Sequence, residues 1–380
     1  MSVCGIICEY NPFHTGHAYQ IAEIKKLGHS VVCVMSGDFV QRGECAFSDK
    51  EKRAQNAINH GADIVLELPF PFSSMSAEGF ARAGIEILSK SGLCTHFAFG
   101  SESADIELLS ETAAIVSGPD FVKGTKKLLS ENPSIGFARA RSRYICENYG
   151  EKYMSVLENP NDILAVEYLK ANMSLEKPLL PIAVKRTVPR SQNDTHFASS
   201  SFIRSEIKSG NLNAVLPYLP YEADISDFLT DDSAFTEFLR LCLSMKTPEE
   251  LKNIAEVSGG VNHAIVKNAK EAENYSELAQ RLANKATTDA KVRRMLLFCL
   301  FGIDKKASAR DVRFTKVLAM TDGGRKLLSE TRKQRNIIIA GKASNVKTDK
   351  IALEQYNTSE NARRILYSCR QVFSPQKKED

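Results

Sequence analysis

The sequence predicts an α/β protein, with a Rossmann-like parallel sheet in its N-terminal half and a mostly α-helical C-terminal half. Short apolar runs alternate with helical segments up to about residue 208, and such alternation implies parallel strands joined by right-handed crossovers. After Gly210 almost every periodic segment has helical spacing. A chain of 380 residues accommodates two domains, which we expect at residues 1–209 and 210–380.

Five segments of the first half have the short, apolar character of buried strands. They are Val3–Cys8, Ser30–Met35, Ala62–Leu68, His96–Phe99 and Pro181–Arg186. Ligands of parallel sheets bind beyond the carboxyl ends of the strands. A site is therefore expected close to His14, Ser36, Pro69 and Gly100.

Helices are expected between these strands at Thr15–Lys26, Asp49–His60 and Ala77–Lys90, and again between Gly100 and Pro178. The helix at Asp49 starts with Ser48-Asp49-Lys50-Glu51, which has the form of a capping box, and Gly61 stops it. In the second half we expect helices at Asn211–Leu216, Asp224–Met245, Pro248–Val257, Tyr275–Ala286, Ala290–Phe301 and Arg310–Ala319.

Composition narrows the class of protein. Hydrophobic residues at 43% and charged residues at 25% predict a globular chain with little disorder. The first apolar run reaches Glu9 too early for a signal peptide, and Met295–Ile303 is too short to span a bilayer. Nine cysteines without a Cys-x-x-Cys pair favour reduced, buried thiols. We expect a cytoplasmic protein without membrane contact or a metal site of its own.

Positive charge is concentrated in one part of a chain whose net charge is only +4. Residues 286–342 hold fourteen Lys and Arg against five Asp and Glu. Their cations are Lys291, Arg293, Arg294, Lys305, Lys306, Arg310, Arg313, Lys316, Arg325, Lys326, Arg332, Lys333, Arg335 and Lys342. These cations could form one basic face that meets a phosphate backbone, or they could lie on the solvated sides of several helices; both interpretations are open.

The first predicted strand ends in a turn with two histidines around one glycine, His14-Thr15-Gly16-His17. Composition alone would give such a His-x-Gly-His match only about 0.007 times in this chain. A strand followed at once by a helix brings free backbone N–H groups and the positive helix end together, which favours phosphate. The imidazoles would add donors. The alternative is a pair of satisfied turn histidines.

A serine-rich segment, Ala198-Ser199-Ser200-Ser201-Phe202-Ile203-Arg204, follows the last predicted strand. Its hydroxyls, its amides and the Arg204 guanidinium would hold a triphosphate and the leaving pyrophosphate. A plain helix cap with a solvated arginine is the alternative.

Together the two motifs resemble the HxGH nucleotidylyl-transferase superfamily, although Ala198 stands where isoleucine is common. Further resemblance covers nearly the whole chain and is to the tRNA(Met) cytidine acetate ligase family. It is carried by Glu9–His17 (EYNPFHTGH), Met35–Glu44 (MSGDFVQRGE) and Phe99–Glu102 (FGSE).

The resemblance implies a ligase that joins acetate to ATP, releases pyrophosphate and passes the acetyl group to the exocyclic amine of the wobble cytidine in elongator tRNA(Met). Mg²⁺ would arrive with ATP, and the basic helical half would contact tRNA. The candidate catalytic residues are His14, His17 and Arg204 from the two motifs, together with Asp38, which is proposed from the position and charge of its loop. The implied nucleotide contacts are Ile7, Cys8, Glu9, Tyr10, Asn11, Pro12, Phe13, His14, Thr15, Gly16, His17, Ala18, Tyr19, Gln20, Gly100, Asn161, Arg186, Ser200, Ser201 and Arg204.

The connection from Ser36 to Phe47 is long and polar, as functional loops at this edge of a sheet usually are. The cytidine amine must lose a proton as it attacks, so Asp38 is our candidate base or orienting group. Arg42 is a candidate phosphate or RNA contact. A merely solvated loop is the alternative.

Two rival functions use the same motifs. A small-molecule adenylyltransferase would transfer AMP and would need no basic helical half. A non-catalytic RNA-binding protein would keep the nucleotide fold as a scaffold, but the intact His14, Gly16, His17 and Arg204 argue against it. We expect pyrophosphate release with acetate to separate the three.

Overall fold

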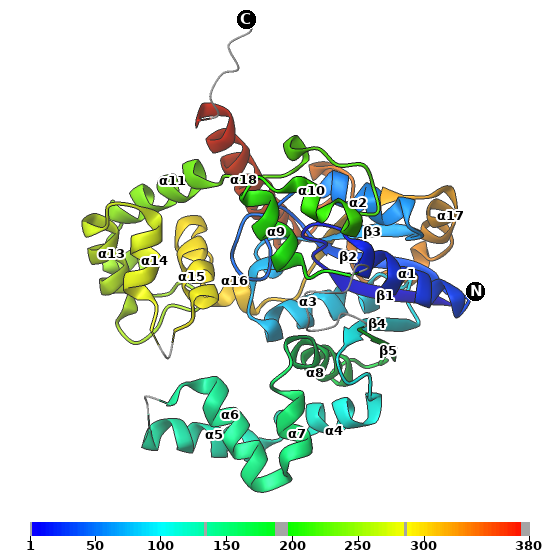
Figure 1. The fold of residues 1–380 in the computed structure, drawn as a ribbon, viewed down its shortest axis with the longest axis horizontal. Helices are drawn as coiled ribbons and strands as arrows, with labels where there is room; N and C mark the ends of the chain where they lie inside the picture. The colour runs from blue at the N-terminus through cyan, green and yellow to red at the C-terminus, as the bar shows by residue number, and fades with distance from the viewer. Residues whose placement is uncertain (1, 133–134, 187–196, 285–286, 374–380) are drawn as a thin grey trace, which may run out of the picture.

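The computed structural model describes residues 2–132, 135–186, 197–284 and 287–373, and its centre is a seven-stranded sheet (Figure 1). The strands lie in the order β5-β4-β1-β2-β3-β6-β7. All five predicted strands are present, as β1 (Val3–Cys8), β2 (Ser30–Ser36), β3 (Ile64–Leu68), β4 (His96–Ser101) and β5 (Leu180–Lys185). They pair in parallel, so their carboxyl ends share one edge of the sheet.

The prediction of a helix at Arg310–Ala319 is wrong, because Phe314–Met320 forms strand β6. This strand pairs antiparallel with the edge of β3, and β7 (Ile338–Ala340) extends the sheet beyond it. Pairing with an open sheet edge and burial of Phe314 outweigh local helical spacing. The sheet therefore contains strands from both sides of residue 209. The division into domains at residues 1–209 and 210–380 stays a prediction.

The helices predicted between the first strands are confirmed as α1 (Thr15–Lys26), α2 (Lys50–Asn59) and α3 (Ala77–Lys90). The predicted cap of α2 is wrong in detail, because Asp49 rather than Ser48 accepts a hydrogen bond from the Glu51 N–H at 2.8 Å. Ser48 instead forms a β-bridge with Phe228. That bridge holds Ser48 outside the helix start.

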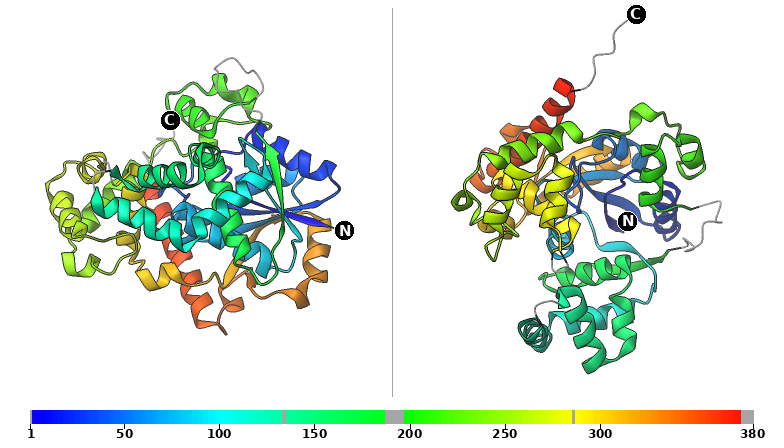
Figure 2. Two further views of the ribbon diagram at one scale, coloured as in Figure 1. Left: turned by 90° about the horizontal axis from the view of Figure 1, so that it is seen from below. Right: turned by 60° about the vertical axis from the view of Figure 1, so that its left-hand side comes forward.

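The connection from β4 to β5 is helical, as predicted, and forms the lobe at the bottom of Figure 1. Its helices are α4 (Ile106–Ser117), α5 (Pro119–Glu131), α6 (Phe137–Tyr149), α7 (Glu151–Val156) and α8 (Pro160–Met173). The last of them, α8, returns to the sheet and packs against α3 and β4, and α4 contacts β5. The right-hand view of Figure 2 shows this lobe standing apart from the yellow helices of the second half.

The second half is mostly helical, but several predicted helices are shorter than expected. Its helices are α9 (Ser200–Lys208), α10 (Leu212–Val215), α11 (Ser233–Ser244), α12 (Pro248–Leu251), α13 (Val261–Glu271), α14 (Tyr275–Leu282), α15 (Asp289–Phe301), α16 (Lys305–Ala309), α17 (Asp322–Glu330) and α18 (Lys350–Phe373). Only Ile225–Asp227 forms a 3₁₀ turn before α11, and the chain then leaves the helical path because Phe228 bridges to Ser48 and Leu229 N donates to the Phe47 carbonyl at 2.6 Å. The predicted end of α14 at Ala286 lies outside the described residues.

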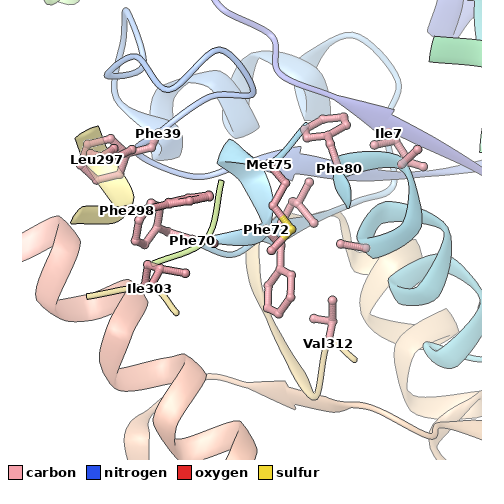
Figure 3. Packing of buried hydrophobic residues seen from close by; sticks show 14 of the residues in the cluster. Ile7, Phe39, Phe70, Phe72, Met75, Phe80, Leu297, Phe298, Ile303 and Val312 are labelled. Carbon is pink, nitrogen blue, oxygen red and sulfur yellow. The ribbon is translucent and has the colours of Figure 1, made fainter. Parts of the chain in front are cut away.

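The second half is attached to the sheet by an aromatic core (Figure 3). Phe39 and Phe70, which follow β2 and β3, lie 5.3 Å apart and point toward α15. Phe70 is 6.3 Å from Phe298 and 5.2 Å from Phe301 between ring centroids. Phe39, Phe70 and Phe298 are almost fully buried, so α15 is fixed against the loops at the sheet's carboxyl edge.

Among the described residues, no helix combines the length and apolar character that crossing a bilayer requires.

Candidate active site

The His-x-Gly-His turn is the N-terminal cap of α1. His14 is the cap residue: its Nδ1 accepts from the Gly16 N–H at 3.0 Å. The His14 N–H in turn donates to Nδ1 of His17 at 3.2 Å. The two rings stack with centroids 3.7 Å apart. Each histidine thus uses its Nδ1 to accept a backbone N–H at the start of the helix. The alternative interpretation, that both are ordinary turn residues with satisfied hydrogen bonds, explains these two Nδ1 atoms but not the two Nε2 atoms.

The same bonds fix the proton positions on the two rings. Burial, then Arg186 and then Arg204, lower the pKa of His14 to about 3, and burial, His14 and Arg186 lower the pKa of His17 well below its usual value. Both imidazoles are therefore neutral near pH 7. Because each Nδ1 accepts a hydrogen bond, the proton lies on Nε2. The turn offers two uncharged Nε2–H donors in addition to the positive end of α1.

A second helix N-terminus meets the first. Ser199 caps α9 by accepting from Phe202 N at 3.2 Å, and the Ser200 hydroxyl lies 3.1 Å from His14 Nε2. Arg204, one turn into α9, donates to the Asn11 carbonyl at 2.7 Å and reaches Ser201 Oγ at 3.4 Å. The structure therefore brings together the two motifs that the sequence predicts to act together.

The carboxyl ends of β4 and β5 lie beside the N-terminus of α1. A pocket lies between these strands and α1, with lining residues His14, Gly16, His17, Tyr19, Gln20, Gly100, Val184, Lys185, Arg186 and Phe197. Seven of these were predicted, whereas Val184, Lys185 and Phe197 were not. Arg186 NH1 donates to Asn161 Oδ1 at 3.4 Å, which joins Asn161 to the pocket wall. The Arg186 side chain lies directly over Gly100, since a Cβ at that position would be in van der Waals contact with Arg186 Cγ at 3.4 Å.

Other members of the predicted contact stretch lie behind the turn. Ile7, Cys8, Tyr10 and Phe13 are buried in the core, and the Tyr10 ring lies 4.8 Å from that of His17. Asn11 is buried too, where its Oδ1 accepts from Phe47 N at 2.6 Å. These side chains shape the turn and leave only their backbone for a ligand.

Arg53 organises the ends of β1 and β2, a role that the sequence analysis missed. The side chain is 1% exposed and donates to the carbonyls of Glu9 at 2.6 Å and Ser36 at 3.0 Å, as well as to those of Gly37 and Ser48. Glu9 Oε1 accepts from Gln41 N at 2.7 Å, and burial raises the pKa of this carboxyl. The β2–α2 loop (residues 37–49) is thereby tied to the strand that leads into the histidine turn.

Asp38 lies in a buried ion cluster. Lys50 Nζ donates to Asp38 Oδ2 at 2.9 Å and to Glu67 Oε1 at 2.7 Å, and Lys50 and Glu67 are 2% and 1% exposed. Burial lowers the pKa of Lys50, but Glu67 and Asp38 outweigh it and raise that pKa above its usual value. Lys50 and Glu67 are not among the predicted site residues, although a glutamate inside the apolar strand Ile64–Leu68 indicates a buried charge that needs a partner.

The β2–α2 loop also contacts the helical lobe formed by α11–α15. A Cβ on Gly43 would lie 2.5 Å from the backbone N of Arg294, so α15 packs directly on the loop backbone. Glu44 pairs with Arg293, and Arg294 forms a two-pronged ion pair with Glu256 at 2.9 and 3.0 Å. The interpretation of this segment as a merely solvated loop is wrong.

The basic residues of 286–342 do not form one face. Arg293, Arg294, Arg310, Arg313 and Lys316 are paired with Glu44, Glu256, Glu354, Asp349 and Glu360 respectively. The others divide between the α15–α16 side and the α17 side of the molecule, which lie on opposite sides of the sheet in Figure 1. Lys291, Lys305, Lys306, Lys326, Arg332 and Lys333 have no ion pair within the described part of the chain.

Within the described ranges, no group of three or more His, Cys, Asp or Glu side chains is arranged to hold a metal ion. The nine cysteines are free thiols, and Cys4, Cys8, Cys33, Cys299 and Cys369 are buried, as the sequence predicts.

Comparisons with known proteins agree with this geometry. The model of the HIGH Nucleotidyl Transferase family matches residues 1–380. A protein named tRNA(Met) cytidine acetate ligase from Caldanaerobacter subterraneus subsp. tengcongensis is 33% identical over 369 residues, which is 92% of this chain and 90% of that protein. One of the same name from Clostridium novyi is 30% identical over 378 residues, 94% of each. A crystal structure of Thermotoga maritima TmcAL bound with α-thio ATP matches with a TM-score of 0.86 and 29% identity, covering 97% of this chain and 94% of the other.

Proposed function

The chain belongs to the HIGH nucleotidyl transferases and, within them, to the family of tRNA(Met) cytidine acetate ligases, and we propose that it acetylates the wobble cytidine of elongator tRNA(Met) at the expense of ATP. The observation that supports the ATP-dependent step best is the meeting of two helix N-termini at His14 and Ser200, with Arg186 and Arg204 beside them. This combination of backbone amides, neutral imidazoles and guanidinium groups is suited to a triphosphate.

In the first step, an acetate oxygen attacks the α-phosphorus of ATP and the bond from this phosphorus to the bridging oxygen of pyrophosphate breaks. Acetate is already a competent nucleophile, so the step needs no protein base. The Nε2–H groups of the two neutral imidazoles donate hydrogen bonds to the phosphate oxygens as the negative charge on these oxygens shifts. Arg204, held by the Asn11 carbonyl, is placed to stabilise the leaving pyrophosphate.

In the second step, the exocyclic amine of cytidine attacks the acetyl carbonyl, the bond from the acetyl carbon to the phosphate oxygen breaks, and the proton lost by the amine passes to the phosphate of the leaving AMP or to water. A wobble base lies in a single-stranded loop, so it can enter a pocket without breaking a duplex. We assign to Asp38 the orienting part of its predicted role, because one of its carboxylate oxygens is bonded to Lys50. Through Lys50 it fixes the loop that carries Gln41 and Arg42 beside Glu9.

The metal and the RNA complete the proposal. Mg²⁺ would be held by the ATP phosphates, since the described side chains offer no cage for it, and no step above depends on it. Residues 210–380 would supply the principal tRNA contacts and residues 1–209 the ATP site, with the β2–α2 loop between them. Of the segment Asn284–Thr288, which loosely resembles a tRNA contact of the family, Lys285 and Ala286 lie outside the described residues.

One incubation tests the function. The protein is given labelled acetate, ATP and total tRNA, and the tRNA is digested to nucleosides, while pyrophosphate release is followed with and without tRNA. We expect acetylated cytidine and acetate-dependent pyrophosphate release. Release that requires a phosphorylated coenzyme precursor instead of acetate would point to the small-molecule adenylyltransferase, and tRNA binding without any pyrophosphate would point to the non-catalytic RNA-binding protein.

A further inference from the structure

Next to the pocket wall made by Gly100 and Arg186 lies a second layer of side chains that do not line the pocket. It consists of Glu102, at the end of β4, and Asp162, in the first turn of α8. Glu102 belongs to a stretch that carries the family resemblance, but neither carboxylate has a role in the mechanism above. Glu102 is bonded to Asn161, which joins the wall through Arg186, and Asp162 is bonded to the chain that leaves β4.

Asp162 holds the chain that leaves β4. It is fully buried, and its Oδ1 accepts from the Ser101 hydroxyl and from Glu102 N at 3.0 Å, while Oδ2 accepts from Ser103 N at 3.2 Å. The Ser101 hydroxyl in turn accepts from Ala104 N at 2.8 Å. Ala104 has φ +54°, a conformation that a residue with a side chain adopts only when its surroundings impose it.

Glu102 decides which way the Asn161 amide faces. Glu102 Oε1 accepts from Asn161 Nδ2 at 2.5 Å, and Oε2 accepts from the Asp162 N–H at 3.1 Å. A carboxylate only accepts hydrogen bonds, so the amide must turn its NH₂ group toward Glu102. Its carbonyl oxygen then faces Arg186, whose NH1 donates to it at 3.4 Å. With the amide reversed, two donors would face each other.

We propose that Glu102 is a positioning residue of the ATP site, which sets the orientation of Asn161 and thereby holds Arg186 against the pocket, while Asp162 holds Glu102 in place through its backbone N–H. The proposal deepens the function proposed above and rests on its ATP site. Arg186 is fixed at both ends: its backbone N–H donates to the Ser101 carbonyl at 3.0 Å and its guanidinium reaches Asn161. Its partners thus come from β4 and α8, the two elements that Glu102 and Asp162 tie together.

Arg186 also acts on the histidines. Around His14 the charged or titratable groups are Arg186 from the end of β5, Arg204 from α9 and His17 from α1 itself. Arg186 lowers the pKa of both histidines. An arginine that leaves the wall therefore allows these pKa values to rise, which would move the acid limb of the activity profile to higher pH. Loss of packing alone would not move that limb.

The test compares Glu102→Ala, Asn161→Ala and the double variant with Glu107→Ala, which removes an exposed carboxylate from the next helix turn. We expect Glu102→Ala to weaken ATP binding about tenfold, as loss of a hydrogen bond to a charged group does, and to raise the apparent pKa of the acid limb. The double variant should bind ATP as Asn161→Ala does, because Glu102 acts through Asn161. Glu107→Ala should match the wild type in both measurements.

Two outcomes would overturn the proposal: unchanged ATP affinity in Glu102→Ala, or single effects that multiply in the double variant. ATP affinity is measured by equilibrium binding and also as the KM in acetate-dependent pyrophosphate exchange, with thermal unfolding as the check on folding. If the wild-type protein bound ATP but showed no exchange with acetate, the proposed function would fail. The binding measurements would still decide the role of Glu102.

Discussion

The two halves of the sheet's carboxyl edge use their polar groups in opposite ways. At β1, β4 and β5, His14, His17 and Arg186 line a pocket, where the Nε2–H of His14 meets only the Ser200 hydroxyl of the second motif. At β2 and β3, Lys50 and Arg53 are 2% and 1% exposed and bind carboxylates and carbonyls of the protein itself. One half is open to a ligand, and the other directs its buried cations at groups of the protein itself.

The difference shows what each half contributes. Buried charges persist only when partners compensate for their lost hydration, so the β2–β3 half forms a rigid frame with one arrangement. That frame carries the β2–α2 loop, against which α15 packs through Gly43 and the aromatic core. Changes in the frame should therefore affect stability first, and changes in the ligand half should affect chemistry first.

The largest effect is expected from Lys50→Met. The substitution leaves Asp38 and Glu67 as buried carboxylates without their cation, which costs about 3–5 kcal/mol of unfolding free energy. Lys52→Met is the matched control on the same helix, because Lys52 is 59% exposed and its ion pair with Asp227 contributes at most about 1 kcal/mol. Urea unfolding measures both. Equal losses in the two variants would contradict the description of this half as a buried frame.

In the ligand half, His14→Asn should reduce acetate-dependent pyrophosphate exchange by about 100- to 1000-fold, since a transition-state donor is lost. Asparagine is itself a good N-cap, so α1 keeps its start and the unfolding free energy changes by less than about 1 kcal/mol. His29→Asn, at the opposite end of the sheet just before β2, is the control and should keep full exchange activity. A variant that folds normally and retains exchange would remove His14 from the mechanism.

The sequence predicted the ligand half better than the frame. A rare His-x-Gly-His spacing after an apolar strand is a local signal, and β1 and α1 have the predicted bounds. The frame depends on pairs far apart in the chain, such as Lys50 with Glu67 and Gly43 with Arg294, which no local pattern contains. Strand β6 was missed for the same reason, because only the edge of β3 makes that segment a strand.

The buried histidines also predict how stability depends on pH. In the unfolded chain a histidine titrates near pH 6.5, whereas burial and the two arginines lower the pKa of His14 to about 3. Between these values the unfolded state binds a proton that the folded state does not, so stability falls as the pH falls below about 6.5. His14→Asn should remove about 1.4 kcal/mol per pH unit from this slope. Denaturant titrations at pH 6.5 and 5 measure it, and parallel slopes in the variant and wild type would contradict the neutral state of His14.

The smallest expected effect concerns cations at the surface. It separates those that bind tRNA from those that do not. Lys291, Lys305 and Lys306 lie on the α15–α16 side, where the helical lobe meets the β2–α2 loop. Lys326, Arg332 and Lys333 lie on the α17 side and have no ion pair in the described chain either, so they form a control set of equal charge. Replacing the first set with alanine should make the plot of log Kd for tRNA against log salt shallower by about 2, because about three phosphate contacts are lost. The second replacement should leave the slope unchanged. If both sets flatten the plot equally, tRNA responds to net charge alone and the α15–α16 side is not its contact surface.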